Sequence, residues 1–397
     1  MSKLKSRLPK GGTNLFQAIK AKCVEAEAAG IKLYRLSIGQ PTGAALVSAR
    51  RAASEAVMSE LESMHEYQDN GSPGVHDFAQ RFVQAHVKRD LRSSDFSLSY
   101  LPIPGIKPML GLIPLACDAQ NQELLVKTMT APGYPTPADW CRYLLIEPLS
   151  LTTTPGNRFR FPVSDLVEGT DLIMTNFPAN PHGQVATKGF WRKICEKAVE
   201  HDIRIFNDAA YAMLAWAKGH STLTEVAVDY PDLSWAEAFS ASKVISNGTG
   251  WRVGAIAGSP DFVGDIATIK GNTDSGFVAF AAAGVIEAVE NDMKSILMIR
   301  NLYQSRIKTL IEILSKHGMR LAVKPGAGFF TLWQLPKKAF GQKIEDAKHF
   351  NFLMIEKTGI VGVHFHPYIR YAVVAPVEDQ AYQLAIDKAF AKAKVKY

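Results

Sequence analysis

The middle of the chain alternates short apolar runs with amphipathic segments, and this alternation limits the folds that the chain can adopt. Strands are predicted at 172–175, 203–206 and 236–239, and the apolar residues of 188–202 recur at helical spacing between the first two strands. Strands that alternate with helices form a mostly parallel sheet with helices on both faces. The pattern therefore predicts an α/β fold whose large domain is built on a mostly parallel, helix-covered sheet.

A second, smaller domain is expected towards the C-terminus. A chain of 397 residues exceeds the size at which one core usually keeps growing. From about residue 277 the pattern becomes helical, and the segments 328–336, 359–367 and 368–375 then have the pattern of strands in a smaller α+β domain. We predict an N-terminal arm with part of the small domain at 1–45, a large domain at 46–285 and a C-terminal small domain at 286–397.

Composition and charge exclude several classes of protein. The formal net charge of +7 is scattered along the chain without a basic cluster or a nucleic-acid-binding motif, so no nucleic-acid partner is expected. No apolar run reaches the ~18 residues that span a bilayer, and the N-terminus lacks a signal-peptide core, so we predict a cytoplasmic protein with no membrane partner. The cysteines form no Cys-x-x-Cys pair, which argues against a metal site and against disulfides; they are Cys23, Cys117, Cys141 and Cys195.

Polar residues follow each of the predicted strands of the large domain. They occupy 176–183, 207–211 and 240–243, directly after the apolar runs. In open α/β sheets, ligands bind beyond the carboxyl ends of the strands. These three segments therefore predict a binding site at that edge of the sheet.

Lys243 lies in the segment FSASKVISNGTGWRVG, at the end of a predicted apolar strand. A lysine amine is a nucleophile only when it is deprotonated, and burial or neighbouring positive charge lowers its pKa. Ser240, Ser242 and Arg252 supply two hydroxyl donors and a guanidinium, a set suited to phosphate. A lysine beside a phosphate site is what a Schiff-base cofactor with a phosphate group requires. The alternative is a surface lysine near a turn, since lysines with a perturbed pKa are rare.

Further side chains at these strand ends suit an aromatic cofactor. Asp208 could pair with a protonated pyridine nitrogen and Tyr211 could donate its hydroxyl to a ring oxygen, with a helix cap and a core aromatic as the alternatives. Asn180 lies between two prolines that fix the direction of its side chain, although a plain turn fits the same residues. Tyr134 follows a Pro-Gly turn, where it could stack on the cofactor or simply pack.

The glycines of GTGWRVG do not indicate a dinucleotide site. Gly248, Gly250 and Gly254 come close to the nicotinamide-cofactor fingerprint, but the last gap is one residue too long. The motif also comes late in the chain, whereas the fingerprint belongs to a first βαβ turn, and there is no Walker-type phosphate loop. We therefore reject a nicotinamide or P-loop nucleotide site.

In their order and spacing these motifs resemble those of class I/II aminotransferases of pyridoxal-phosphate fold type I, over nearly the whole chain. The family's patterns are matched by Ser-x-Ser-Lys at 240–243, Gly-x-Arg-x-Gly at 250–254, Asn-x-Pro-x-Asn-Pro-x-Gly at 176–183, Asp-x-x-Tyr at 208–211 and Pro-Gly-Tyr-Pro at 132–135. The segment LSIGQP looks like the family's segment near the substrate carboxylate. The resemblance implies pyridoxal 5'-phosphate (PLP) as the cofactor, bound by the large domain, and a transferase activity in amino-acid metabolism.

The resemblance also implies a role for each residue around the cofactor ring. Lys243 would bind the cofactor aldehyde covalently and move a proton between the substrate α-carbon and the cofactor. Asp208 would hold the protonated ring nitrogen, and Asn180 and Tyr211 would bond the ring oxygen. Tyr134 would stack on the ring. Lys243, Asp208 and Tyr211 are therefore the predicted catalytic residues.

The phosphate and the substrate receive their own predicted residues by the same resemblance. The cofactor phosphate would be bound by Ser240, Ser242, Arg252 and the backbone amides of Ile106 and Lys107. Arg370 would grip the substrate α-carboxylate in a bidentate fork, with Gly39 and Asn180 close to it. Tyr67 resembles the tyrosine that the neighbouring subunit lends to the phosphate, which implies a homodimer with shared active sites.

Two departures from the family pattern concern loops. The stretch from Lys243 to Arg252 is one residue longer than usual, so we expect a bulge that Gly248 accommodates. The segment before Arg370 lacks the usual glycine-rich lead-in, so that loop is expected to be short. Both departures affect the edge of the substrate pocket, and therefore the substrate side chains that the pocket accepts.

The segment KGNTDSG at 270–276 resembles the LL-diaminopimelate aminotransferase-like subgroup. It suggests transfer between LL-diaminopimelate and 2-oxoglutarate, with Asn272 and Asp274 near the distal polar groups of the substrate. The alternative structural role is a cap, by Asp274 or Ser275, on the next helix. The alternative activities are transfer from aspartate, alanine or aromatic amino acids, or a C–S/β-lyase reaction on the same fold. A non-catalytic regulator is disfavoured because too few residues precede Gly39 for a DNA-binding domain.

Overall fold

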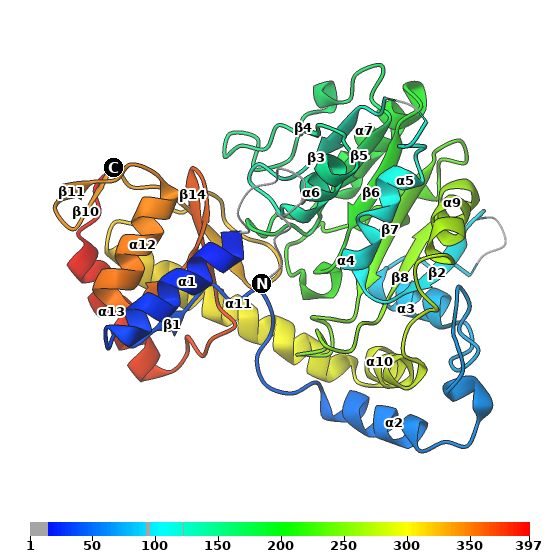
Figure 1. Ribbon diagram of the computed structural model, residues 1–397, viewed down its shortest axis with the longest axis horizontal. Helices are drawn as coiled ribbons and strands as arrows, with labels where there is room; N and C mark the ends of the chain where they lie inside the picture. Colours follow the sequence, from blue (N-terminus) through cyan, green and yellow to red (C-terminus); the bar gives the residue numbers. More distant parts are fainter. Residues whose placement is uncertain (1–14, 93–95, 122) are drawn as a thin grey trace, which may run out of the picture.

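The structure is a computed structural model that describes residues 15–92, 96–121 and 123–397. Two lobes are joined side by side, and the larger one is built on a central sheet (Figure 1). The sheet has seven strands in the order β2 (Ser99–Ile103), β8 (Gly254–Gly258), β7 (Trp235–Ser240), β6 (Arg204–Asp208), β5 (Leu172–Thr175), β3 (Val126–Thr128) and β4 (Leu149–Ser150). All neighbours pair in parallel except that β8 runs antiparallel to both β2 and β7. The predicted fold class is confirmed.

Helices cover both faces of this sheet because its strands present apolar side chains on both sides. In β8, Ala255 and Ala257 belong to a core cluster with α3 (Phe78–His86) and α10 (Ala279–Asn291). The intervening Ile256 belongs to the opposite cluster, which includes Phe262 and Ile266 of α9 (Pro260–Lys270). Successive residues of a strand point to opposite faces, so a strand that is apolar on both faces is buried from both sides.

The remaining helices of the large lobe are mostly short. They are α2 (Val47–Val57), α4 (Ile106–Met109), α5 (Leu112–Leu115), α6 (Thr136–Tyr143), α7 (Lys188–Glu200) and α8 (Thr224–Ala227), with 3₁₀ turns at Glu62–Met64, Val163–Asp165 and Ala212–Leu214. The longest of them, α7, begins where the side chain of Thr187 accepts a hydrogen bond from the Phe190 amide. It connects β5 to β6, as a crossover between parallel strands requires.

The smaller lobe combines the two ends of the described chain. Its antiparallel sheet has the order β13 (Val363–Phe365), β14 (Tyr368–Ala372), β9 (Phe330–Gln334). The helices are α1 (Leu15–Ala28), α12 (Ala347–Thr358) and α13 (Gln380–Ala393), and the short strands are β1 (Tyr34–Arg35), which pairs with β12 (Ile360–Val361), and the pair β10 (Lys338–Ala339) and β11 (Gln342–Lys343). Residues 1–14 of the predicted N-terminal arm lie outside the described residues, and the domain boundaries near 45 and 285 stay predictions.

A long helix, α11 (Met293–Lys316), connects the two lobes (Figure 1). It is separated from α10 by Asp292, whose side chain caps it by accepting a hydrogen bond from the Ser295 amide. One end of α11 packs beside the 3₁₀ turn at Ala212–Leu214 in the large lobe, and α11 also contacts β9 and α13 in the small lobe. The helical pattern predicted from residue 277 is thus two helices with one break.

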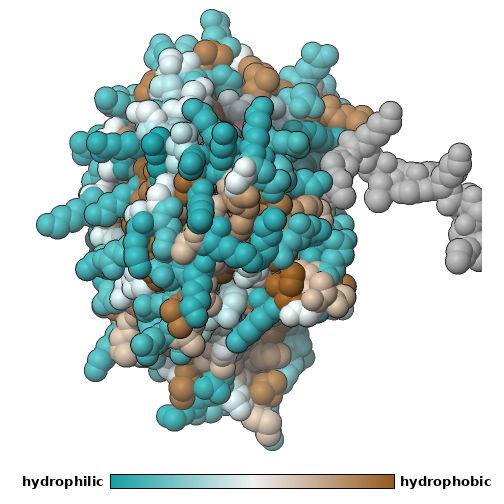
Figure 2. All heavy atoms as spheres, turned by 90° about the vertical axis from the view of Figure 1, so that its left-hand side faces the viewer, coloured by the Kyte–Doolittle hydropathy of each residue, from teal (hydrophilic) through white to brown (hydrophobic). Residues whose placement is uncertain are grey.

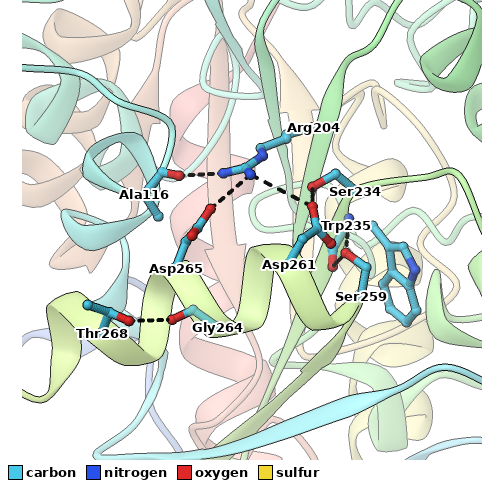
Figure 3. Close-up of polar contacts among 9 residues, drawn as sticks. All are labelled: Ala116, Arg204, Ser234, Trp235, Ser259, Asp261, Gly264, Asp265 and Thr268. Atoms are coloured by element: carbon cyan, nitrogen blue, oxygen red, sulfur yellow. Dashed lines mark hydrogen bonds and ion pairs between the residues drawn. The ribbon is translucent and has the colours of Figure 1, made fainter. Parts of the chain in front are cut away.

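Arg204, the first residue of β6, anchors α9 to the amino-terminal edge of the sheet (Figure 3). Its Nη2 atom lies 2.9 Å from Asp265 Oδ2 and 3.7 Å from Asp261 Oδ2, and Nη1 donates to the carbonyl of Ala116. The guanidinium also lies 4.7 Å from the centre of the Phe262 ring. This cluster, which we call the Arg204 cluster, joins β6, α9 and the turn after α5.

The small-lobe end of the molecule has a mainly hydrophilic surface. Figure 2 shows hydrophobic side chains there singly or in small groups among hydrophilic ones, as expected for a solvated face. None of the helices described is long and apolar enough to span a bilayer. The four cysteines are buried and form no disulfide with one another, and within the described ranges no group of acidic, histidine or cysteine side chains is arranged to hold a metal ion.

Candidate active site

One cavity of about 630 Å³ opens at the carboxyl ends of β5, β6 and β7. Every residue predicted for the site lines it except Tyr67: Gly39, Ile106, Lys107, Tyr134, Asn180, Asp208, Tyr211, Ser240, Ser242, Lys243, Arg252 and Arg370. These residues come from segments that are more than 300 positions apart at the extremes. The parallel sheet therefore gathers the predicted site at the edge where ligands of this architecture bind.

Lys243 follows β7 by three residues, and its side chain is largely buried at the cavity. Within the described part of the chain its Nζ atom has no hydrogen-bond or ion-pair partner, and it lies 5.5 Å from the centre of the Tyr211 ring. Burial lowers the pKa of Lys243; the charge of Asp208 acts against that shift, and the charge of Arg252 adds to it. A buried amine with a lowered pKa is a candidate nucleophile, so the surface-lysine alternative is wrong.

Asp208 is the last residue of β6 and points a carboxylate into the same cavity. Its Oδ1 atom accepts one hydrogen bond, from the Ala210 amide at 3.0 Å, and the described residues give it no ion-pair partner. Burial raises the pKa of Asp208 to about 6, while the Ala210 amide and the charge of Lys243 act against the rise. A partly buried carboxylate that accepts only one hydrogen bond destabilises the fold. This indicates that a cationic group of a ligand pairs with Asp208.

Arg252 lies against the turn that leads into α4. Its Nη1 donates to Thr249 O at 3.0 Å and its Nη2 to Pro104 O at 3.1 Å. A Cβ atom on Gly105 would lie 2.2 Å from Nη2, so only glycine leaves room for the guanidinium there. Both acceptors are neutral carbonyl groups, so the charge of the guanidinium remains available to pair with an anionic ligand.

Two buried serines stand beside Arg252 in the cavity. Ser240 and Ser242 are each less than 5% exposed, and the Ser242 amide donates to Ser240 Oγ at 3.2 Å. The backbone amides of Ile106 and Lys107 open α4, where the first amides of a helix lack intrahelical acceptors. Hydroxyls, amides and one guanidinium around a cradle closed by Gly105 form a set that fits a phosphate group.

The longer stretch between Lys243 and Arg252 takes its left-handed backbone conformations at Ser246 (φ 65°) and at Arg252 itself (φ 54°). Gly248 is not among the positive-φ residues, but a Cβ there would lie 2.6 Å from Ile245 Cγ1. Gly248 therefore makes room for the longer stretch by lacking a side chain, and the turn bends at Ser246.

Arg370, in β14, brings the small lobe to the cavity. It is 1% exposed, and its guanidinium lies 4.3 Å from the centre of the Phe330 ring. Its Nη1 donates to Asn180 Oδ1 at 2.9 Å and its Nη2 to Ser37 O at 2.8 Å, while its Nε has no partner in the described residues. Burial lowers the pKa of Arg370 to about 10. A buried cation whose partners are all neutral is prepared for an anionic ligand.

The remaining predicted residues complete the walls of the cavity. Tyr211 is buried against the rings of Phe329 and Phe330, and burial raises the pKa of its hydroxyl. Tyr134 is partly exposed in the cavity wall. Gly39 approaches the guanidinium of Arg370, because a Cβ on it would lie 3.8 Å from Nη2. The short turn between β13 and β14 agrees with the shortened loop expected before Arg370.

Sequence reasoning missed several residues that line the cavity: Phe16, Gln40, Pro108, Leu110, Trp140, Asn176, Ala210 and Thr249. Some had a signal, since Asn176 and Ala210 lie inside recognised motifs and Gln40 follows Gly39. Phe16 and Trp140 belong to helices α1 and α6 that carry no motif. Their approach to the cavity depends on tertiary packing, which spacing along the chain does not report.

Tyr67 does not line the cavity of its own chain. Tyr67 is 77% exposed, and the nearby residues Met58 and Leu61 are also exposed. The amides of the next two residues, Gln68 and Asp69, donate to the carbonyl of Ser275. Tyr67 therefore has no contact with the predicted cofactor site within one protomer, and its predicted role depends on a partner subunit.

The segment 270–276 lies outside the cavity, and the structure gives it a different role from the two we considered. Lys270 is fully buried, and its Nζ donates to Asp274 Oδ1 at 2.7 Å, to Asp69 O and to Asn70 Oδ1. Asn272 donates to Thr268 O, on the same helix end. Neither Asn272 nor Asp274 lines the site, and the next helix begins only at Ala279. The segment ties the Asp69–Asn70 turn to α9.

Comparison with known proteins agrees with this geometry. Residues 31–388 match the family of aminotransferases of class I and II. The chain belongs to this family. The aminotransferase is 28% identical to the LL-diaminopimelate aminotransferase of Syntrophobacter fumaroxidans over 379 residues, 92% of each chain. It is 24% identical to the asparagine–oxo-acid transaminase of Streptococcus mutans, over 91% of each chain.

Its fold is shared with solved aminotransferases. A double mutant of Thermus thermophilus aspartate aminotransferase superimposes with a TM-score of 0.83 over 99% of this chain and 100% of that chain, at 19% sequence identity. The predicted membership of the aminotransferase fold is confirmed, and aminotransferase is the activity that the family and its named relatives support.

Proposed function

We propose that this aminotransferase binds PLP through Lys243 and moves an amino group between an L-amino acid and a 2-oxo acid. The observation that carries the proposal is that one cavity joins an unpaired buried lysine, a poorly paired buried carboxylate and a phosphate-sized cradle. PLP has a group for each of them: an aldehyde, a pyridine nitrogen and a phosphate. When bound, it supplies an electron-withdrawing ring that stabilises negative charge at the substrate α-carbon.

Each part of the cavity then has a separate task. Asp208 holds the ring nitrogen protonated, which compensates its own buried charge. Ser240, Ser242 and Arg252 bind the phosphate, together with the amides at the start of α4. Tyr134 stacks on the ring, and Asn180 and Tyr211 bond its oxygen. Lys243 holds the cofactor and, once released by an amino-acid substrate, accepts and returns the proton of the substrate α-carbon.

The substrate carboxylate is bound by Arg370 in this proposal. The guanidinium is buried, lacks an acidic partner and is held by Asn180 and by Ser37 O. A planar fork of this kind binds a carboxylate through two parallel hydrogen bonds. Gly39 lies close enough to the guanidinium to form the edge of that subsite.

For the substrate we propose LL-diaminopimelate with 2-oxoglutarate as acceptor. The support is the similarity to curated LL-diaminopimelate aminotransferases and the presence of the polar residues Lys107 and Gln40 in the lining of the cavity. A panel of amino donors, including aspartate, alanine and aromatic amino acids, tests it through conversion of the cofactor to its amino form, which changes its absorbance. Release of ammonia and pyruvate from a β-substituted donor would indicate a lyase instead.

We further propose a homodimer in which Tyr67 of each chain reaches the phosphate of the other. The support is the high exposure of Tyr67 and of the neighbouring apolar side chains Met58 and Leu61. Light scattering on a size-exclusion column measures the mass in solution. A Tyr67→Phe variant that binds PLP as tightly as the parent protein, or a monomeric active enzyme, would contradict this arrangement.

Borohydride reduction of the PLP-loaded protein tests the central proposal. Reduction should leave a pyridoxyl group on Lys243, to be found by peptide mapping. The chain provides an internal control in Lys270, a fully buried lysine whose amine is held by Asp274 and which should stay unlabelled. Lys243→Ala should lower transamination by at least about 10³-fold. A label on any other residue, or full activity of this variant, would disprove the role of Lys243.

A further inference from the structure

A second buried carboxylate, Glu237, lies in the strand next to Asp208. It belongs to β7, opposite Asn207 of β6, and it is fully buried. Its side chain does not line the cavity. The tasks proposed for the site therefore leave Glu237 without a role, although a buried carboxylate destabilises a fold unless it is fully hydrogen-bonded.

Glu237 accepts four hydrogen bonds. Oε1 accepts from Asn207 Nδ2 at 2.7 Å and from the Leu223 amide at 3.0 Å. Oε2 accepts from the amide and from the hydroxyl of Thr224, both at 2.7 Å. Burial raises the pKa of Glu237 to about 7, and these donors act against the rise. Four donors and no acceptor match the ionised carboxylate, which only accepts.

Asn207 connects this carboxylate to the turn after β5. Its Nδ2 atom donates to Phe177 O at 3.0 Å as well as to Glu237. Its Oδ1 atom accepts from the Phe177 amide at 3.0 Å and from Thr175 Oγ1 at 2.8 Å. Both polar groups of the Phe177 backbone are therefore held by one amide side chain, whose orientation depends on which partner faces each of its ends.

The turn held in this way carries the residues of the site. The Asn180 amide donates to Asn176 Oδ1 at 2.8 Å, and Asn176 Nδ2 donates to Asp208 O at 2.8 Å. The side chain of Asn180 then accepts from Arg370 Nη1 at 2.9 Å. Hydrogen bonds thus lead from Glu237 through Asn207 to the Phe177 backbone, the chain of the turn connects Phe177 to Asn180, and a further hydrogen bond joins Asn180 to Arg370.

We infer that Glu237 is a positioning residue: its carboxylate fixes the orientation of the Asn207 amide and thereby the turn that presents Asn180 to the cofactor and to Arg370. A carboxylate can face only the NH₂ end of Asn207, so the oxygen end must face the Phe177 amide. A glutamine at 237 cannot accept from all four donors, because its own NH₂ group faces either the Asn207 and Leu223 donors or the Thr224 donors, so the set that holds Asn207 is no longer fully bonded. The inference deepens the proposed function and rests on it, since Asn180 is given its ligands there.

The Glu237→Gln variant of the PLP-loaded enzyme tests the inference. Loss of one aligned hydrogen bond corresponds to about a tenfold effect. We expect the dissociation constant of PLP, measured by fluorescence titration, to rise about tenfold and the KM of the amino donor to rise by a similar factor, with a smaller change in kcat. The absorbance maximum of the bound cofactor should shift as well, because Asn180 bonds the ring oxygen.

Thr224→Val is the matched control. It removes one donor to the same carboxylate, on the Oε2 side that faces away from Asn207, and leaves the Thr224 amide in place. We expect it to lower stability while the dissociation constant of PLP and the KM change less than about twofold. Equal effects of the two variants on PLP binding and KM would reduce Glu237 to a structural residue and overturn the inference.

A double-mutant cycle with Asn180→Ala separates action through Asn180 from a general effect. In the Asn180→Ala background, Glu237→Gln should change KM less than about twofold; an undiminished tenfold effect there overturns the inference. If Glu237→Gln does not fold, Thr175→Val removes a hydrogen bond from the other end of Asn207 and should raise KM about threefold. No change in Thr175→Val would overturn it too. Failure of the parent protein to bind PLP would refute the proposed function instead.

Discussion

Arg204 and Asp208 are the first and last residues of β6, and their charged groups differ in how many partners they have. Arg204 has Asp265 and Asp261 as acidic partners and a carbonyl acceptor in Ala116 (Figure 3). Its guanidinium also lies against the Phe262 ring. Asp208, only four residues later, accepts a single amide hydrogen bond. One strand thus carries a fully paired cation at one edge of the sheet and a carboxylate with a single hydrogen bond at the other.

The difference shows where this protein uses charge for stability and where it keeps charge for a ligand. The same distinction separates Lys270 from Lys243, because Lys270 is bonded to Asp274 and two further oxygens, whereas Lys243 has none of these contacts. Groups that stabilise a fold find partners within it, and groups that bind or react keep their bonding capacity. Variants at the two ends of β6 should therefore affect different measurements.

The largest expected effect is that of Asp208→Asn on activity. Asparagine has nearly the same shape but lacks the charge that would hold a pyridinium, so kcat should fall by about 10²–10³-fold. Steady-state transamination and PLP titration measure it. A variant that retains more than a tenth of the parent kcat would show that Asp208 is not part of the chemistry.

Arg204→Ala should have the second largest effect, and on stability alone. It leaves Asp261 and Asp265 without their cation and Ala116 O without its donor, which corresponds to a loss of about 2 kcal/mol of unfolding free energy for a partly exposed cluster. Urea denaturation measures the loss. Activity per folded molecule should stay within about twofold, and a selective loss of kcat would break the comparison.

In the cofactor-free protein, Asp208→Asn should increase the free energy of unfolding, and the size of this increase should depend on pH. Burial raises the pKa of Asp208 from 3.8 to about 6, so the folded state binds more protons than the unfolded state between these values. The penalty of the buried charge is absent below pH ~4, grows as the pH rises and is complete above pH ~6. Cofactor-free Asp208→Asn should therefore be more stable than the parent by about 2 kcal/mol at pH 7, but not at pH 4.

Urea denaturation from pH 4 to 8 measures this difference, and a pH-independent difference would contradict the buried-charge explanation. Arg204→Ala is the control, because in the cluster around it burial acts to raise the pKa of Asp261, but hydrogen bonds outweigh burial and leave that pKa lowered.

The smallest effect should come from Ser234→Ala, at the edge of the Arg204 cluster. The Ser234 hydroxyl donates to Asp261 Oδ2 at 2.5 Å, but the Asp261 side chain is 53% exposed, so water replaces the lost donor. A loss of about 0.5 kcal/mol is expected. A loss as large as that of Arg204→Ala would show that the cluster depends on the serine rather than on the arginine.

Sequence-based prediction succeeded for continuous buried strands and for the short motifs that follow them. The strand at 172–175 was predicted with its observed bounds, because β5 is a continuous buried run. Each of the short motifs contributes at least one residue to one cavity, since strand ends of a parallel sheet converge. The sequence did not reveal that this stretch bends at Ser246, because a left-handed conformation at a serine has no local sequence signal.

The other failures involve partners far apart in the chain. The contacts of Lys270 with the Asp69–Asn70 turn, about 200 positions away, cannot be predicted from local motifs. The antiparallel direction of β8 and the approach of Trp140 and Phe16 to the cavity depend in the same way on packing between distant segments. Local pattern does not report such contacts.

The continuity of α11 limits how the length of this protein can vary. A helix of 24 residues is about 36 Å long, and each inserted residue would rotate everything beyond it by about 100°. An insertion in the middle of α11 would therefore swing β9 and its neighbour β14 away from the strand ends of the large lobe, whereas insertions in exposed surface turns would leave that alignment intact. The helix acts as a spacer of set length, and engineered fusions or circular permutations should place their junctions elsewhere.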